Sequence, residues 1–250
     1  MTYVELLTSL AALKSKHSCY QILHPWIREA VKETYLPSGK REAERQSYME
    51  EILPLKGKEL LDIGANTGYF SFSALEKGAK HVTAVEGNAE HARFLVEASR
   101  LLGIENRFNV ENSYFNFSAP QFHHLDIILC LNVLHHLGDD FGDPLISLAE
   151  AKIAIAQALA RMAKHSTWMW LQLGFNWKGD KSQPLFTNGL KIELIDFVSK
   201  SCISAWSIVN IAIYNPDKNV YENASDQLLK RFDPIGEFLN RPLFLLRSVF

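Results

Sequence analysis

Short apolar runs alternate with amphipathic stretches through most of this chain of 250 residues. Four apolar runs have the length of strands, at residues 59–63, 81–85, 107–110 and 125–131. Helical spacing follows at residues 69–77, 89–102 and 143–164. The run LDIILCL at 125–131 is interrupted only by Asp126, as in a central parallel strand buried on both faces. This alternation predicts an α/β fold with a doubly wound parallel sheet.

The last third of the chain continues the pattern and then changes it. Further apolar runs lie at residues 166–173, 203–214 and 242–250, with a helix predicted at about 190–200. No helix suited to a parallel crossover separates the last two runs, so we expect an antiparallel hairpin at that edge. Residues 174–188 hold glycines, a proline and three large aromatic side chains, which makes this loop a candidate substrate wall.

The first 55 residues lie in front of the first strand and have a helical pattern. Apolar positions predict helices at residues 4–13, 25–35 and 40–53, and Pro54 ends the third. We interpret residues 1–55 as an N-terminal helical cap and residues 56–250 as the domain that carries the sheet.

The sequence ELLDIGANTGYF at residues 59–70 has the clearest chemical meaning. A buried strand ends at Gly64, and a helix begins after Gly68. Glycine lacks a Cβ, so the backbone can turn sharply there and lie close to a ligand, and the helix presents free N–H groups. Asn66 stands at the centre of a G-x-x-x-G spacing. This departs from the dinucleotide fingerprint G-x-G-x-x-G and makes a pyrophosphate site less favoured.

This stretch resembles motif I of the class I S-adenosylmethionine (SAM)-dependent methyltransferases, in which an acidic residue precedes a G-x-G-x-G loop. Asp62, Gly64 and Gly68 match that form, while Asn66 departs from it, as in subfamilies with a G-A-N-x-G loop. The resemblance covers residues 56–250. It implies a seven-stranded sheet of order 3-2-1-4-5-7-6 with the last strand antiparallel. It also implies that SAM is bound by Asp62, Gly64, Ala65, Asn66 and Gly68.

Glu86 follows the second apolar run and precedes a turn. An acid at that position has no evident structural need of its charge. It lies about twenty residues beyond the glycine loop, where doubly wound nucleotide sites place an acid for the ribose hydroxyls. Glu86 also matches the acidic residue of motif II in the family. We therefore expect Glu86, with Gly87 and Asn88 of the turn, to contact the cofactor.

Two further strand ends complete the cofactor site that the resemblance implies. A polar and a small residue after the third strand flank the adenine in the family, and Asn112 and Ser113 fit that description. Glu111 is the alternative if the strand register differs by one residue. Leu131 and Asn132, at the end of the fourth run, correspond to motif IV, which lies beside the transferred methyl group in the family.

His135 and His136 follow at the same strand end, where such sheets bind ligands. Imidazole titrates near neutral pH, so either ring could be the general base for a hydroxyl acceptor; the alternative is a histidine bonded to the backbone at a helix start. The sequence N-V-L-H-H-L resembles the small-molecule and cofactor-biosynthesis branches and lacks the N-P-P-Y form of many amino-group methylases. Neither this pair nor His123-His124 has the spacing of a zinc motif, so we predict no metal.

Other side chains have both a functional and a plain structural interpretation. Arg41, Arg45, Gln46 and Tyr48 in the third predicted helix could reach the cofactor's carboxylate or adenosine, but we favour a solvated, charged helix face. The rings of Tyr69, Phe70 and Tyr114 could face the sulfonium, but we favour core packing.

Composition narrows the choice of partner and compartment. The net charge of −2 provides no global positive field for phosphate backbones, so nucleic acid is not indicated, although a local patch could suffice. Cys19, Cys130 and Cys202 are few, odd in number and far apart, which favours a reducing compartment. No signal peptide and no run of about 20 apolar residues is recognisable. We expect a cytoplasmic protein without a membrane span and leave its oligomeric state open.

The resulting prediction is a SAM-dependent methyltransferase that releases S-adenosylhomocysteine (SAH). Its expected acceptor is an oxygen of a small molecule or a glycan. One alternative is a tRNA-modifying methyltransferase, which a basic stripe on the N-terminal helices would support. Another is a non-catalytic interaction protein that retains the fold. A nicotinamide-dependent dehydrogenase comes third, and competition between NAD and SAM would separate it.

Overall fold

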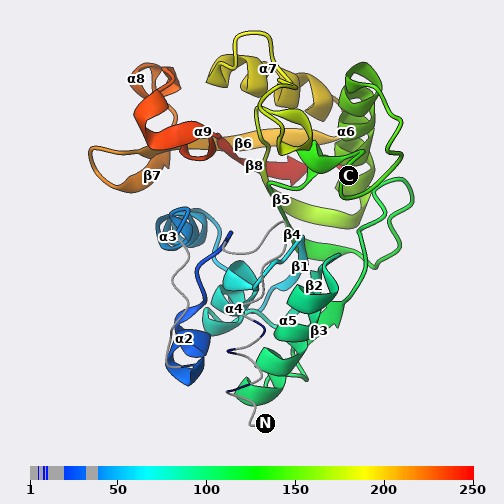
Figure 1. Ribbon diagram of the computed structural model, residues 1–250, viewed down its shortest axis with the longest axis vertical. Helices are drawn as coiled ribbons and strands as arrows, with labels where there is room; N and C mark the ends of the chain where they lie inside the picture. The colour runs from blue at the N-terminus through cyan, green and yellow to red at the C-terminus, as the bar shows by residue number, and fades with distance from the viewer. Residues whose placement is uncertain (1–4, 6–7, 9, 11–19, 32–38) are drawn as a thin grey trace. The chain divides into compact units, whose positions relative to one another are not determined.

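The computed structural model describes residues 5, 8, 10, 20–31 and 39–250. Most of the helix expected at residues 4–13 therefore lies outside the described residues, as does Cys19. The chain forms two compact units, Met1–Tyr114 and Phe115–Phe250, which are described in turn (Figure 1). Both units are of the α/β type, as the alternation of apolar runs predicts.

The first unit has three parallel strands, β1 (Glu59–Ile63), β2 (His81–Val85) and β3 (Phe108–Glu111), in the order β3-β2-β1. The connecting helices are α4 (Tyr69–Glu76) and α5 (Ala89–Leu102), and they are preceded by α2 (Pro25–Val31) and α3 (Glu42–Ile52). The apolar strand residues pack with Phe72, Phe94 and Leu95 of the helices to form the core. These elements lie within a few residues of the ranges that the sequence predicts.

Two helix ends of the first unit follow directly from the residues there. The side chain of Asn88 accepts hydrogen bonds from the backbone N–H groups of Glu90 and His91, so it caps the start of α5. Gly68 begins α4 with a φ of 78°, in the left-handed region that glycine adopts most easily. A Cβ at Gly68 would lie 2.5 Å from Leu95 Cδ2, so the loop lies directly against the core.

The second unit contains five strands in the order β4-β5-β8-β6-β7. They are β4 (Leu125–Leu131), β5 (Ser166–Gln172), β6 (Trp206–Asn215), β7 (Val220–Asn223) and β8 (Leu243–Ser248). Strands β4 and β5 are parallel, whereas β8 is antiparallel to both β5 and β6. The predicted antiparallel last strand is therefore confirmed.

Helices α6 (Leu148–Met162) and α7 (Lys191–Cys202) pack against each other in the second unit (Figure 1). The shorter helices are α8 (Asp226–Leu229) and α9 (Gly236–Leu239). Single 3₁₀ turns occur at η1 (Leu134–His136), η2 (Ala163–His165), η3 (Trp177–Gly179) and η4 (Asp233–Ile235). Among the helices that the structure describes, none is long and apolar enough to cross a membrane.

The predicted strand count is wrong by one. The complete order is β3-β2-β1-β4-β5-β8-β6-β7, with eight strands instead of seven. The additional strand β7 lies in a segment that reads as polar and helical, and only its pairing with β6 makes it a strand. Without β7, the order agrees with the predicted 3-2-1-4-5-7-6.

Two boundaries also differ from the prediction. Helix α6 begins at Leu148 and not at Asp143, because Ser147 and Glu150 form a reciprocal capping box. The Asp143 carboxylate instead accepts a hydrogen bond from Leu145 N in the preceding turn. Strand β6 begins at Trp206 and not at Ile203, which is an exposed residue of the turn before it.

Candidate functional site

The glycine loop and Glu86 form one hydrogen-bonded unit. Asn66 N donates to Glu86 Oε2 at 2.7 Å, and Asn88 N donates to Glu86 Oε1 at 2.8 Å. Glu86 is buried at the end of β2, so its carboxylate connects the loop after β1 to the turn before α5. The expectation that its charge has no structural use is therefore wrong.

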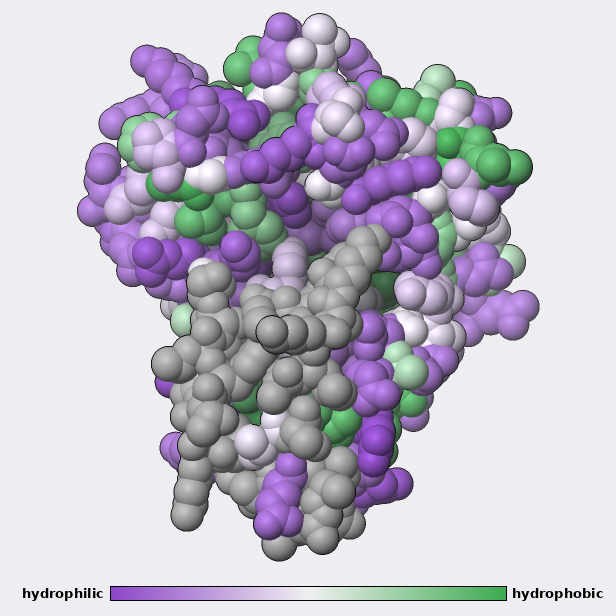
Figure 2. All heavy atoms as spheres, viewed as in Figure 1, coloured by the Kyte–Doolittle hydropathy of each residue, from purple (hydrophilic) through white to green (hydrophobic). Residues whose placement is uncertain are grey.

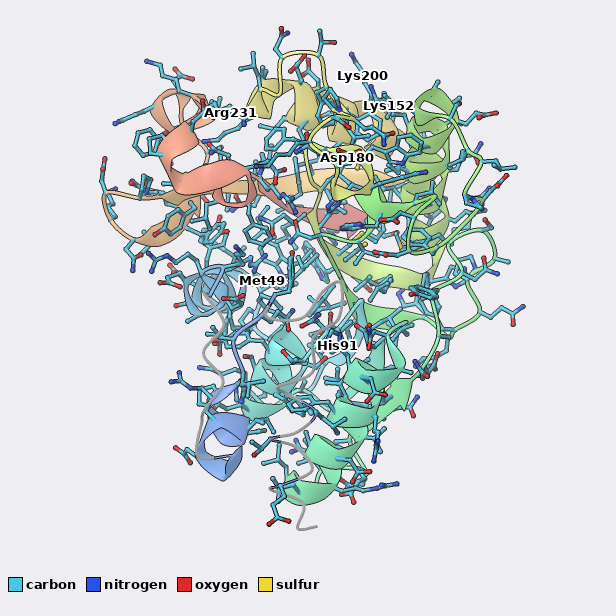
Figure 3. All side chains as sticks on the ribbon, viewed as in Figure 1. Met49, His91, Lys152, Asp180, Lys200 and Arg231 are labelled. Atoms are coloured by element: carbon cyan, nitrogen blue, oxygen red, sulfur yellow. The ribbon has the colours of Figure 1, made fainter. Side chains whose placement is uncertain are left out.

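Asn66 takes the place of the middle glycine because it adopts glycine-like backbone geometry. Its φ is 54°, in the left-handed region that asparagine tolerates better than most residues. Its side-chain nitrogen lies 3.3 Å from Nδ1 of His91, a buried residue in the first turn of α5 (Figure 3). His91 was missed from the sequence, where its only signal is its place in the helix that follows Glu86.

Asp62 is buried within β1 and accepts a hydrogen bond from Ser71 Oγ at 2.7 Å. Burial raises the pKa of its carboxyl to about 6, and the nearby charge of Glu86 acts in the same direction. The Ser71 hydrogen bond opposes the shift. Asp62 therefore begins to lose its charge just below neutral pH.

Asn112 and Ser113, the two residues expected beside the adenine, are both exposed, and they differ in their contacts. The Asn112 amide donates to the carbonyl oxygens of Glu86 and Gly87, so it holds the turn after β2. Ser113 follows and is exposed. A Cβ on Gly87 would lie 2.3 Å from the Tyr114 ring, so that ring lies against the Gly87 backbone. Tyr114 is 57% exposed, and its assignment to core packing is therefore wrong.

Helix α3 buries polar side chains that the sequence favours as solvated. Arg45, Gln46 and Tyr48 are buried, so the solvated-face interpretation is wrong for these three. It holds for Arg41, which is exposed and pairs with Glu44 at 3.3 Å. The Arg45 guanidinium carbon lies 4.8 Å from the centre of the Phe70 ring. Phe70 and its neighbour Tyr69 are buried in the first turn of α4, as expected of core rings.

Some buried polar atoms of the first unit have no hydrogen-bond partner within the described residues. They are Glu42 Oε1, both amide atoms of Gln46, and Thr67 Oγ1. Buried polar atoms are nearly always satisfied, so these groups call for a partner such as a water molecule, an ion or a ligand. Thr67 belongs to the glycine loop itself, and an orphaned hydroxyl there fits a polar cofactor.

In the second unit, Asn132 belongs to a buried polar network at the ends of β4 and β5. Its amide donates to Gln172 Oε1 at 2.9 Å, and its oxygen accepts from Arg241 Nη1 at 2.8 Å. Arg241 also pairs with Glu237, whose carboxylate accepts from Phe175 N at 2.9 Å. Leu131 is the last residue of β4 and is half-buried. Sequence reasoning missed Arg241 and Glu237, which are distant from β4 along the chain.

The structure distinguishes the two adjacent histidines. His135 is buried, and its Nδ1 accepts a hydrogen bond from Gly174 N at 3.2 Å. This bond assigns the proton of a neutral His135 ring to Nε2. His136 Nδ1 instead faces carboxylates, 3.4 Å from Asp140 Oδ2 and 3.8 Å from Asp139 Oδ2. The ligand atoms of these three residues lie within 4.8 Å of one another, so they could also hold a metal ion.

A cavity of about 420 Å³ lies in the second unit. Its aromatic lining is Phe175 and Phe186, from the loop that the sequence marks as a substrate wall. Its polar lining includes Thr187, Asn188, Arg231, Asp233 and Glu237. Trp177 of the same loop is buried and donates to Leu137 O at 2.7 Å.

The charged residues that line the cavity are one cation and two anions, and each of them is ion-paired. Arg231 pairs with Asp233 and lies 5.6 Å from the Phe175 ring centre (Figure 3). Glu237 pairs with Arg241, as described above. Polar side chains also cover much of the visible face of this unit (Figure 2). The cavity therefore offers hydrogen-bonding groups and aromatic surface without an excess of positive charge.

Comparison with known proteins finds a methyltransferase domain in part of the chain. Residues 61–164 match the profile of a family described as Methyltransferase domain. The ubiquinone biosynthesis O-methyltransferase of Nitrosospira multiformis is 28% identical over 127 residues, 50% of this chain and 47% of that protein. The tRNA U34 carboxymethyltransferase of Nautilia profundicola is 26% identical over 154 residues, 57% of this chain and 46% of that protein. The chain thus spans about half the length of these curated relatives.

A solved structure agrees with these sequence matches at the level of the fold. The bifunctional kinase-methyltransferase WbdD superposes with a TM-score of 0.57 and 16% identity, over 96% of this chain and 46% of that one. The matched family segment begins in β1 and includes the glycine loop, Glu86 and both histidines. The methyltransferase-domain match over residues 61–164 supports a class I SAM-dependent methyltransferase.

Proposed function

We propose that this protein transfers a methyl group from SAM to a hydroxyl oxygen of a neutral small molecule or glycan, releasing SAH. The observation that carries the proposal is the buried Glu86 carboxylate, which accepts hydrogen bonds from both the glycine loop and the turn before α5. This arrangement fixes the two backbone segments that bind a nucleoside in doubly wound folds.

The first unit supplies most of the proposed cofactor contacts. Glu86 receives the ribose hydroxyls, and Gly87 and Asn88 provide backbone beside it. Asn112 and Ser113 flank the adenine. The loop of Asp62, Gly64, Ala65, Asn66 and Gly68 approaches the rest of the cofactor. The group bound here supplies an electrophilic methyl on a sulfonium sulfur.

We assign the role of general base to His136 rather than to His135. The Asp139 and Asp140 carboxylates face His136 Nδ1 and favour a proton there, which makes Nε2 the basic nitrogen. A base in this state can take the proton of an acceptor hydroxyl as the oxygen is methylated. In His135 the hydrogen bond from Gly174 N assigns the opposite tautomer, so its Nε2 is a donor.

The cavity of the second unit is the proposed acceptor pocket. Of the lining residues, Arg231 is cationic and Asp233 and Glu237 are anionic, so the lining has no net positive charge. A phosphate-rich ligand would find little attraction there. Asparagine, threonine and carboxylate groups beside two phenylalanine rings suit an uncharged molecule with several hydroxyls.

The relative that modifies tRNA makes tRNA the second candidate acceptor. The expected supporting feature was a basic stripe on the cap helices. On α3 and its N-cap residue, the charged side chains outside the core are Arg41, Glu44, Glu50 and Glu51, which are mostly acidic. The part of the cap that the structure describes therefore favours the neutral acceptor.

We also propose that residues 1–55 cover the cofactor and that the reaction takes place in the cytoplasm.

Calorimetric titration of the purified protein with SAM, SAH and NAD tests the cofactor. We expect SAM and SAH to bind and NAD not to compete. An acceptor screen with labelled SAM follows, with hydroxylated small molecules and sugars in one arm and tRNA in the other. Label transfer to tRNA alone would reject the neutral acceptor. Binding of NAD in preference to SAM would reject the methyltransferase, and SAM binding with no transfer to any acceptor class would favour a non-catalytic role.

A further inference from the structure

We propose that Glu237 and Arg241 are positioning residues, which hold the lining of the cavity at a fixed place relative to the turn that carries His136. The inference rests on the proposed function, in which the cavity binds the acceptor and His136 is the base. Both residues belong to the second unit: Glu237 lies in α9, and Arg241 lies two residues before β8. They form an ion pair with each other.

Arg241 connects the ends of two strands to the start of a third. Its Nη1 donates to Asn132 Oδ1 at 2.8 Å, and its carbonyl oxygen accepts from Gln172 Nε2 at 3.0 Å. Asn132 directly follows β4, and Gln172 is the last residue of β5. All three residues are buried. A guanidinium is planar and donates in fixed directions, so these contacts define where the end of β4 lies.

Glu237 connects Arg241 to the cavity. Its Oε1 accepts from Arg241 Nε at 3.0 Å and from Phe175 N at 2.9 Å. Glu237 and Phe175 both line the cavity. Desolvation offsets most of the attraction within a buried ion pair, so we attribute this pair to geometry rather than to stability.

The loop that contains Phe175 also contacts the turn of His136 on both sides of that residue. Gly174 N donates to His135 Nδ1 at 3.2 Å, and Trp177 Nε1 donates to Leu137 O at 2.7 Å. The hydrogen bonds therefore form a closed circuit from the end of β4 through the arginine, the glutamate and the loop to the turn after β4. We call this circuit the strand-end frame; it consists of residues 132–137, 172–177, 237 and 241.

The frame has a direct consequence for methyl transfer. An acceptor hydroxyl that binds to the cavity lining must reach the base at hydrogen-bond distance, and a displacement of about 1 Å can cost about 10²-fold in rate. Glu237 and Arg241 act on this distance through the loop and the strand end. Breaking either link should therefore slow transfer more than it lowers the unfolding temperature.

Two substitutions break the frame at different links. Glu237→Gln still offers an oxygen to Phe175 N, but its amide nitrogen replaces an acceptor that faces Arg241 Nη2. Arg241→Lys keeps a positive charge beside Glu237 and removes the planar second arm that reaches Asn132. Because both substitutions open the same circuit, the double variant should lose no more than the more damaging single variant.

Hydrogen exchange followed by NMR tests the frame without any acceptor. The reporters are the Gly174 amide and the Trp177 indole N–H, whose acceptors are in the turn of His136. We expect both to exchange about tenfold faster in each variant, while the amides of α7 exchange as in the parent. Lys218 and Glu222 form an exposed ion pair with the same spacing, so Lys218→Gln combined with Glu222→Gln is the matched control and should change neither reporter.

Transfer of label from SAM tests the consequence for the reaction. The probe is an equimolar mixture of catechol, myo-inositol and methyl glucoside at saturating SAM. The transfer rate should fall about tenfold or more in both single variants and to the same level in the double variant. SAH affinity and the unfolding temperature of Glu237→Gln should stay close to those of the parent.

Four results would overturn the inference. The first is faster exchange confined to the Phe175 amide, which would indicate one local hydrogen bond. The second is a uniform increase that includes α7, which would indicate general destabilisation. The third is losses that multiply in the double variant, and the fourth is a normal transfer rate in variants with faster exchange. If the parent transfers no label to this mixture or to tRNA, the proposed function fails, and the exchange measurements still decide whether the frame exists.

Discussion

The backbone N–H of Asn66 donates a 2.7 Å hydrogen bond to the carboxylate of Glu86, twenty residues further along the chain. This bond joins the glycine loop to the end of the neighbouring strand. Glu86, which the sequence predicts to bind ribose, therefore also holds the glycine loop, which is proposed to bind the rest of the cofactor. Loss of Glu86 should affect both properties, so the experiments below separate them.

Replacing Glu86 with alanine should weaken SAH binding by about 1–3 kcal/mol, the cost of leaving buried polar groups unpaired. Adenosine and 2′-deoxyadenosine report on the ribose contact alone: the parent should prefer adenosine, and Glu86→Ala should remove that preference. Glu90→Ala, an exposed acid in the same region, is the control. A preference that persists in Glu86→Ala would restrict Glu86 to supporting the loop.

The backbone conformation at Asn66 predicts which of two substitutions at this position gives the more stable protein. At a φ of 54°, Asn66→Ala should lower the free energy of unfolding by about 1 kcal/mol, because alanine resists the left-handed region. Asn66→Gly avoids that strain and should be more stable than Asn66→Ala, although it loses the contact with His91. Urea unfolding of the two variants measures the order. Equal stabilities would show that strain at this position is unimportant.

The raised pKa of Asp62 predicts that the free energy of unfolding depends on pH. Its pKa is about 6 in the folded protein, against 3.8 for an unperturbed carboxyl. Between these values the folded state binds more protons than the unfolded state, so the Asp62 contribution to the free energy of unfolding falls as pH rises from 4 to 6. Asp62→Asn cannot ionise and still accepts from Ser71. It should therefore be more stable than the parent at pH 7, by on the order of 2 kcal/mol.

Denaturant unfolding of Asp62→Asn across the pH range checks this difference. The stability advantage of the variant should shrink as pH falls toward 4, where the parent carboxyl is protonated as well. The exposed Asp217→Asn serves as the control and should follow the parent at every pH. A variant less stable than the parent at pH 7 would show that the Asp62 charge stabilises the fold.

The two histidines should respond differently to substitution. His136→Ala should reduce methyl transfer by about 10²–10⁴-fold and leave SAH affinity nearly unchanged, as expected of a general base. His135→Ala should instead lower the free energy of unfolding by about 1–3 kcal/mol, because Gly174 N loses its buried acceptor. Normal turnover by His136→Ala would refute the base assignment. Activity that a chelator abolishes and a divalent ion restores would assign His136, Asp139 and Asp140 to a metal instead.

The acceptor pocket can be tested by filling it. Thr187→Trp adds a large side chain at the lining of the cavity and should raise the KM for the acceptor severalfold or more, with SAH affinity unchanged. Lys181→Trp places the same side chain at an exposed position of the same loop and should leave both constants unchanged. Equal effects of the two substitutions would argue that the acceptor binds elsewhere.

Much of this protein follows from local sequence. The apolar runs and the glycines at helix ends define β1 to β6, β8 and the principal helices, because strand and helix periods are properties of a few neighbouring residues. Gly64, Gly68 and Glu86 indicate the cofactor site for the same reason, since a strand, a loop and a helix consecutive in sequence build it. The resemblance to the methyltransferase family depends on these segments.

Other features of the protein depend on contacts between residues that are distant in sequence, and only the tertiary structure decided these. Strand β7 exists only through its pairing with β6, and the bridge from Glu86 to Asn66 requires two strand ends to lie together. The sequence of α3 does not reveal that Arg45 and Gln46 are buried, because most of its residues are polar and exposure depends on what packs against the helix. The tautomer assigned to His135 likewise depends on a hydrogen bond from Gly174 N, 39 residues further along the chain.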